Sequence, residues 1–203
     1  MKFLDAKITP PLIPDEVIDK YHEVYSLGEI VHNEDVVLTL VKKGMKALIV
    51  DIRNNGGGLV DQSVQMADYF LDTGTNILIE RDNKQRETIT KAETKKKITM
   101  PTVVLVNEYS ASASEIFSAA VKEKADNVTI VGTKTFGKWT IQTLHQFPDW
   151  ASLKYTIGKR FPPSGLSIDH TWITPDVIVE FDASGYVNND IDNQLEEAKS
   201  LFK

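Results

Sequence analysis

Residues 102–142 follow a strand, turn, helix, strand pattern, and this pattern limits the fold more than any other part of the chain. Residues 102–106 (TVVLV) and 128–131 (VTIV) are short, mostly apolar runs, and a helical stretch over 113–124 separates them. Such runs are typical of strands that are covered on both faces, where neither face needs polar side chains. The segment therefore predicts two buried strands joined by a helix.

The same pattern occurs elsewhere in the chain, which contains no internal repeat and no low-complexity linker. The other expected elements are a buried strand at 47–52, an amphipathic helix over 60–71, strands at 75–80, 87–90, 141–147, 153–157 and 175–180, and a terminal helix over 192–202. The alternation of strands and helices favours an α/β fold with one core domain.

The beginning of the chain does not follow this pattern. Residues 1–16 contain three prolines, which favours an extended arm. A strand is possible at 23–27, and a helix is expected to open at about residue 34. We therefore predict an N-terminal arm over 1–33 and a core domain over 34–203.

Composition excludes several classes of function. The 203 residues carry a formal net charge of -6, which argues against a protein that follows nucleic-acid phosphates. The absence of cysteine excludes disulfides, thiol catalysis and cysteine metal sites. No apolar run approaches the roughly 20 residues that span a bilayer, and the first residues lack the apolar core of a secretory signal. The sequence alone leaves the cellular compartment open.

Three serines, Ser110, Ser112 and Ser114, alternate with alanines in the turn before the helix at 113–124. Serines at such a turn often cap the helix that follows. A functional interpretation is also open, because a helix beginning here directs main-chain N–H groups and its positive dipole end at a developing oxyanion. A serine hydroxyl is a weak nucleophile, so this interpretation needs a base nearby.

Lys138 is the better candidate for that base. None of the four histidines, His22, His32, His145 and His170, lies in a loop with a recognisable acidic partner. Lys138 follows the apolar, tightly turning sequence Thr-Phe-Gly, where loss of water would lower its pKa towards neutrality. Gln142, four residues later, would share a strand face with Lys138 and could hold its amine.

A second loop, with glycines at 56–58, follows the buried strand at 47–52. It could be a tight turn, or its main-chain N–H groups could approach a substrate and form a second oxyanion donor. The spacing fits neither the dinucleotide-binding nor the phosphate-binding glycine motif, so no nucleotide cofactor is indicated.

Six segments together resemble the carboxyl-terminal processing proteases, the tail-specific proteases of peptidase family S41. They occur in the family's order at 47–71, 101–121, 131–142, 156–169, 172–180 and 192–198, and they cover most of residues 45–203. The resemblance implies an α/β core of the ClpP/crotonase type. It also implies a serine endopeptidase with a Ser-Lys dyad.

The resemblance assigns a role to each candidate residue. Ser112 would be the nucleophile, Lys138 the general base, and Gln142 the residue that orients the base. The N–H of Ala113 and one N–H from Gly57 or Gly58 would form the oxyanion hole. Family substrates are protein C-terminal tails, often apolar, and no metal or cofactor is implied. Family members are mostly found outside the cytoplasm, in the cell envelope or the thylakoid lumen.

Two of the chain's departures from the family pattern bear most on its function. Nothing in it resembles the PDZ domain that family members usually carry. All three tryptophans, Trp139, Trp150 and Trp172, stand where the family usually has glycine. We expect Trp139 to place an indole near the mouth of the site. If the original glycines needed positive φ, the tryptophans there carry strain.

These departures keep two other functions open. A non-catalytic S41-like module that binds apolar ligands would retain the fold without the activity. An acyl-CoA enzyme of the crotonase type would share the fold but would need an acid-base carboxylate and a CoA-binding surface, which the serine and lysine motifs do not favour. Retention of Ser112, Lys138 and Gln142 together favours the peptidase.

Overall fold

The computed structural model describes residues 25–26, 44–95, 97–148, 150–166 and 172–202. The predicted arm over 1–33, apart from strand β1 (Tyr25–Ser26), and the helix expected from residue 34 lie outside these residues. So do His22, His32 and His170. The boundary between arm and core therefore stays a prediction.

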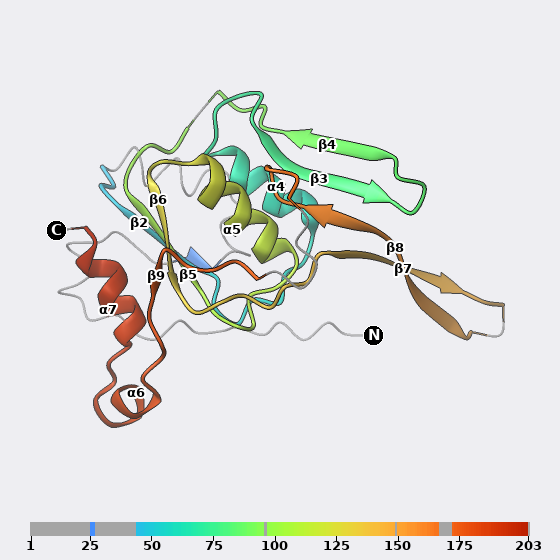
Figure 1. Ribbon diagram of the computed structural model, residues 1–203. Coiled ribbons are helices and arrows are strands. Elements are labelled where there is room, and N and C mark those ends of the chain that lie inside the picture. The colour runs from blue at the N-terminus through green and yellow to red at the C-terminus, as the bar shows by residue number, and fades with distance from the viewer. Residues whose placement is uncertain (1–24, 27–43, 96, 149, 167–171, 203) are drawn as a thin grey trace.

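A parallel sheet forms the centre of the protein (Figure 1). Its strand order is β1-β2-β5-β6-β9, and its further strands are β2 (Leu48–Asp51), β5 (Thr102–Val106), β6 (Val128–Gly132) and β9 (Val177–Ile178). The sheet pairs Val50 with Val104 and Val104 with Ile130. The apolar runs in the sequence are thus the central strands, as predicted.

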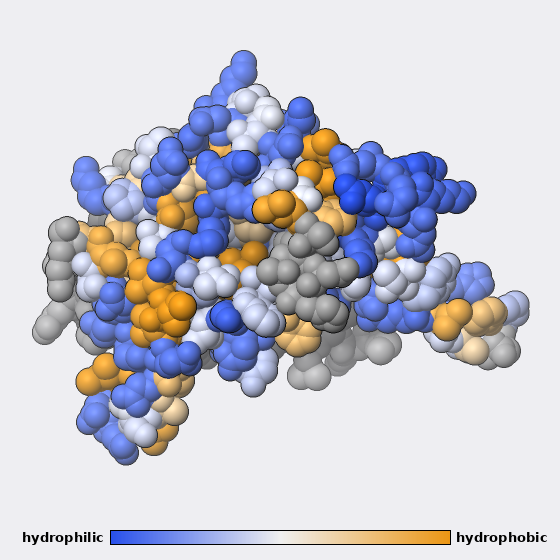
Figure 2. All heavy atoms as spheres, viewed as in Figure 1, coloured by the Kyte–Doolittle hydropathy of each residue, from blue (hydrophilic) through white to orange (hydrophobic). Residues whose placement is uncertain are grey.

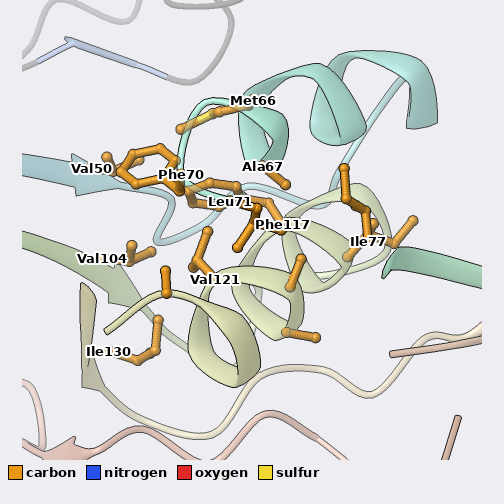
Figure 3. Close-up of a cluster of buried hydrophobic side chains, with 14 of the residues drawn as sticks. Val50, Met66, Ala67, Phe70, Leu71, Ile77, Val104, Phe117, Val121 and Ile130 are labelled. Atoms are coloured by element: carbon orange, nitrogen blue, oxygen red, sulfur yellow. The ribbon is translucent and has the colours of Figure 1, made fainter. Parts of the chain in front are cut away.

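Helices cover both faces of this sheet, which explains why its strands need no polar face. Helices α4 (Val60–Asp68) and α5 (Ala113–Lys124) pack on one face, where Val104 lies in the same core cluster as Phe70 and Phe117 (Figure 3). The two phenylalanine rings meet edge to face at 5.8 Å between centroids. Helix α7 (Asn193–Ser200) covers the other face, where Ala198 packs against Val103 and its neighbours.

A second, antiparallel sheet lies beside the helices, with the order β4-β3-β8-β7. Its strands are β3 (Asn76–Asp82), β4 (Glu87–Lys91), β7 (Thr140–Gln146) and β8 (Ser152–Phe161). Strand β8 pairs with β3 only over 158–161. The outer part of the β7–β8 hairpin is therefore a two-stranded ribbon that projects from the body (Figure 1).

The predicted α/β class is confirmed, and two of the differences from the expected elements have a visible local cause. The strand expected at 175–180 is reduced to β9. At its start the Asp176 carboxylate accepts the Ile130 N–H at 2.9 Å where a ladder bond would form, and at its end the partner strand β6 stops at Gly132. Helix α6 (Ala183–Asn189) was not predicted, although Asp182 caps it by accepting the N–H groups of Ser184 and Gly185. None of the helices in the described ranges is long and apolar enough to cross a bilayer.

Candidate active site

Two of the three turn serines have structural roles. Ser110 is buried, and its hydroxyl donates to the Ile52 carbonyl at 2.8 Å while accepting the Asn107 N–H at 3.0 Å. Ser114 is also buried and donates to the Asn55 carbonyl at 3.0 Å. Both hydroxyls therefore join the serine turn to the loop that follows β2, and neither is placed to attack a substrate.

Ser112 differs from both neighbours. It is only half-buried, and it lies immediately before α5, at the end of a turn that comes from the buried strand β5. Its φ of 56° and ψ of -112° are unusual for a residue with a side chain, and such conformations are concentrated at functional sites. A serine on a strained strand-to-helix turn is also the arrangement of the nucleophile elbow in α/β-hydrolases. Local geometry therefore selects Ser112 among the three serines.

The glycine-rich loop packs directly against this turn. Gly57 has a φ of +92°, and a Cβ on it would lie 2.8 Å from the Ala113 nitrogen and 2.9 Å from the Ser112 Cβ. Only glycine fits such a close approach in this conformation. The contact is held by a hydrogen bond of 3.0 Å from the Ala111 N–H to the Asn55 carbonyl.

The structure separates the candidate oxyanion donors. Ala113 is the first residue of α5, where an N–H has no partner within the helix. The Gly57 N–H donates to the Asn55 side-chain oxygen at 2.9 Å and is therefore engaged. The Gly58 N–H has no hydrogen bond to any residue that the structure describes. Among the described residues, Ala113 and Gly58 are the candidates whose N–H groups have no hydrogen-bond partner, and the oxyanion hole stays a prediction.

Lys138 is exposed, so the expectation that it is desolvated is wrong for this structure. The apolar context expected around it does not form a pocket. Phe136 is 62% exposed, and Thr135 is the residue of that segment that turns inwards. Within the described part of the chain, no hydrogen bond joins the Lys138 amine to Ser112 or to Gln142.

The strand argument that placed Gln142 beside Lys138 also fails. Strand β7 begins at Thr140, so Lys138 lies in the loop before it. The pairing of β7 with β8 shifts register between Ile141 and Gln142, which breaks the period of two on which the argument rested. The Gln142 side chain is exposed. Its orienting role therefore rests on the family resemblance.

A residue that sequence reasoning missed, Glu115, connects the two halves of the site. Its side chain is fully buried and accepts four hydrogen bonds. One oxygen accepts from the Thr135 hydroxyl at 2.7 Å and the Gly137 N–H at 2.6 Å. The other accepts from the Ser112 N–H at 2.9 Å and the Lys138 N–H at 2.8 Å. One carboxylate thus fixes the serine turn and the lysine loop relative to each other.

Part of this signal was present in the sequence. Ser112 and Glu115 have the spacing of a capping box, in which a glutamate reaches back to the N–H of the N-cap residue. That spacing predicts the bond to Ser112, which the structure contains. The bonds to Gly137 and Lys138 span more than 20 residues and have no local signature.

The tryptophans also lie differently from expectation. Trp139 is 5% exposed and belongs to the main core cluster, so it does not stand at the mouth of the site. Lys138 and Trp139 are neighbours that face opposite ways, one to solvent and one to the core. Trp150 does have a positive φ, of 68°, whereas Trp172 does not. The strain expected at the tryptophans is therefore confined to Trp150.

A charged cluster anchors α7 beside the glycine-rich loop. The Arg53 guanidinium donates to Asp51 at 2.6 Å, and to Asp192 and Gln194 at 3.0 Å each. Burial acts to lower the pKa of Arg53, but hydrogen bonds and charges from Asp51 and Asp192 outweigh it and raise that pKa. Burial likewise acts to raise the pKa of Asp192, and hydrogen bonds from Arg53 and the Leu195 N–H outweigh it and lower that pKa.

Comparisons with known proteins agree with this geometry. The family model described as Peptidase family S41 matches residues 32–179. The carboxy-terminal processing protease CtpA of Bacillus subtilis is 38% identical over 188 residues, which are 87% of this chain and 40% of that protein. A CtpA-like serine protease of Staphylococcus aureus is 40% identical over 72% of this chain and 30% of its own length. The chain thus spans less than half the length of these relatives.

Solved structures give the same result. The photosystem II D1 C-terminal processing protease is 34% identical, with a TM-score of 0.65 over 72% of this chain and 38% of that one. Mature CPAF, at 16% identity and a TM-score of 0.67 over 86% of this chain and 46% of that one, shares the fold. The α/β core is therefore the one found in S41 proteases. On the match of the family model and of these relatives, the chain belongs to peptidase family S41.

Proposed function

We propose that this chain is the catalytic core of a serine endopeptidase that processes the C-terminal regions of proteins, with Ser112 as nucleophile and Lys138 as general base. The observation that carries the proposal is the setting of Ser112. Its side chain is the accessible one of the three serines, it has a strained backbone, and Gly57 of the glycine-rich loop packs directly against it. The names of the relatives, which are processing proteases, support the same reaction.

In this mechanism Ser112 Oγ attacks the carbonyl carbon of the scissile peptide bond while the Lys138 amine takes the hydroxyl proton. The Ala113 and Gly58 N–H groups donate to the oxyanion that forms. The C–N bond then breaks, and the leaving amine receives the proton from Lys138. Water attacks the resulting ester with Lys138 again as base, and the carboxylic acid product leaves Ser112 free.

An amine must be neutral to accept a proton, and the Lys138 side chain is exposed in the structure. In the proposal, a bound polypeptide covers the amine and excludes water from it. Gln142 then holds the amine towards Ser112. Glu115 keeps both loops in place throughout, because it binds the main-chain N–H groups of Ser112 and Lys138 rather than the reacting atoms.

Cleavage of an unstructured protein with an apolar C-terminus tests the proposal. Ser112→Ala and Lys138→Ala should each abolish cleavage. Lys134→Ala is the matched control, because Lys134 is an exposed lysine of the same loop whose amine lies 4.7 Å above the Trp172 ring. Cleavage that persists in Ser112→Ala would refute the assignment of the nucleophile.

A non-catalytic binding module is the second candidate. The exposed Lys138 amine, which has no bond to Ser112, favours it. In that case the wild-type protein would bind apolar peptides without cleaving them, and a fluorophosphonate would not label Ser112. Labelling that Lys138→Ala suppresses would favour the peptidase instead.

A further inference from the structure

The outer part of the β7–β8 hairpin has two properties that a folded domain normally avoids. Beyond the pairing of β8 with β3 over 158–161 and the contacts of Asn83 with Ile157 and Thr156, each of its strands pairs with one neighbour only among the described residues. An isolated two-stranded ribbon is marginally stable in water unless something packs on it. The ribbon also exposes large apolar side chains, including Leu153 at 51% and Tyr155 at 45%.

The register shows which main-chain groups of β7 face the open edge. The Phe147 N–H donates to the Ala151 carbonyl at 2.8 Å, so odd-numbered residues of β7 pair with β8. Thr156 gives an independent check, because its carbonyl accepts from the Asn83 side chain at 3.3 Å, on the side away from β7. Thr156 lies opposite Gln142. The residues that direct N–H and C=O groups outwards are therefore Gln142, Leu144 and Gln146.

This edge lacks the features that usually prevent another strand from adding. Exposed edges commonly carry charges or proline. Strand β4, at the other edge of the same sheet, begins with Glu87 and ends with Lys91. Strand β7 (TIQTLHQ) has no Lys, Arg, Asp, Glu or Pro. Among the described strands of this sheet, β7 therefore presents an unprotected edge.

One face of the ribbon is apolar. Residues directly opposite each other share a face, so His145 lies with Leu153, and Phe147 and Tyr155 lie on the same side by the period of two. The His145 and Phe147 rings meet at 4.8 Å between centroids. Figure 2 shows hydrophobic side chains near the outer end of this hairpin. A strand added beside β7 would place every second side chain over this face.

We propose that the polypeptide substrate binds as an extended strand along the open edge of β7, with alternate apolar side chains over the face formed by His145, Phe147, Leu153 and Tyr155. This rests on the proposed function. We assign the substrate to this edge because the open edge of β7 continues directly from the candidate active site. Strand β7 begins two residues after Lys138, whose N–H is fixed by Glu115. The recognised class is unstructured polypeptide with alternating apolar residues.

A backbone scan of the substrate tests this inference without requiring cleavage. A short fluorescein-labelled peptide of alternating leucine and serine is titrated with the Ser112→Ala protein, and each peptide nitrogen is methylated in turn. Strand addition uses every second N–H of the ligand, so we expect about fivefold weaker binding for methylation at alternate positions and little change between them. Equal effects at all positions would overturn the proposal.

A pair of variants tests the enzyme side. The Leu144 N–H faces the open edge, so Leu144→Pro removes a donor to the substrate without removing a bond to β8. Leu144→Ala shortens the same side chain and keeps the donor. We expect KM for a cleaved peptide to rise about fivefold in Leu144→Pro relative to Leu144→Ala, with kcat unchanged. The same KM in both variants would exclude a role for the edge.

The outcomes separate this inference from the proposed function. Fluorophosphonate labelling of Ser112 and any cleavage report the function. The alternating effect of N-methylation on peptide affinity for Ser112→Ala reports strand addition at the edge. A protein that shows this effect but is neither labelled nor able to cleave would refute the proposed function and leave the edge proposal standing. A wild-type dimer in sedimentation that Leu144→Pro dissociates, with peptide affinity unchanged, would show that a second copy occupies the edge and would overturn the proposal.

Discussion

Replacing Glu115 by glutamine tests whether one carboxylate holds the site together. All four groups that contact the Glu115 side chain donate hydrogen bonds to its oxygens. Only a carboxylate without a proton offers an acceptor to each of them. The amide nitrogen of glutamine must face two of these donors. The Thr135 hydroxyl can rotate and accept from the amide instead, whereas the Gly137 N–H can only donate. If the amide nitrogen takes the place of the other oxygen, it faces the N–H groups of Ser112 and Lys138, and both of these can only donate. At least one partly buried N–H therefore loses its partner.

The expected magnitude follows from these contacts. A buried donor without a partner costs about 1–3 kcal/mol, and each remaining bond weakens by about 1 kcal/mol when its acceptor loses the charge. We therefore expect the unfolding free energy of Glu115→Gln to fall by about 4 kcal/mol. Because domains of this kind are stable by about 5–15 kcal/mol, the variant should still fold. Misplacement of Ser112 and Lys138 should lower kcat about 100-fold.

Urea unfolding and peptide turnover at a temperature where the variant is folded measure the two effects separately. Glu123→Gln is the matched control, because Glu123 lies on the same helix and accepts from Ser164, but at the surface. The control should change both quantities little. Wild-type stability and wild-type kcat in Glu115→Gln would refute the reasoning. A large loss of stability with full kcat would show that Glu115 does not position the reacting groups.

Three further changes have direct structural predictions. Gly57→Ala should lower kcat at least about 100-fold, because the new Cβ meets the turn that carries Ser112, whereas Gly56→Ala has open space and should have little effect in the same peptide assay. Trp150→Gly should raise the urea-unfolding free energy by about 1 kcal/mol, because it relieves a left-handed backbone at a residue that is 84% exposed. Asp192→Asn keeps a good helix cap but removes the charge beside Arg53. Since the folded pKa of Asp192 is lowered, the wild-type protein should be more stable than this variant above about pH 4, and the difference should vanish as acid protonates the carboxyl. An equal difference at all pH values would contradict this.

The fold could be predicted from the sequence because its signals are local. The central strands are apolar runs, and helix α5 has the bounds that its pattern predicts. The strand expected at 175–180 was overestimated in part because the Asp176 side chain takes the place of a ladder bond. This replacement depends on where strand β6 lies. The residue pattern of 175–180 alone carries no information about that position.

The candidate site was harder to predict because its environment comes from distant segments. Lys138 was expected to be desolvated by the residues beside it, but burial depends on which neighbour faces the core. Trp139 faces it and Phe136 does not, and both are large and apolar. The way these two side chains face is set by the loop that Glu115 holds through the N–H groups of Gly137 and Lys138. A bond across more than 20 residues thus decides the exposure of the proposed base.

One local contact and two long-range contacts account for the strained backbone of Ser112. A positive φ costs about 1–3 kcal/mol at a residue with a side chain and persists only where the surroundings fix it. Here the Ser112 N–H is held by Glu115, and the neighbouring Ala111 N–H and Ser114 hydroxyl are both held by the Asn55 carbonyl. One anchor lies within α5 and the other follows β2. The backbone of Ser112, the proposed nucleophile, is therefore fixed jointly by α5 and by the loop that follows β2.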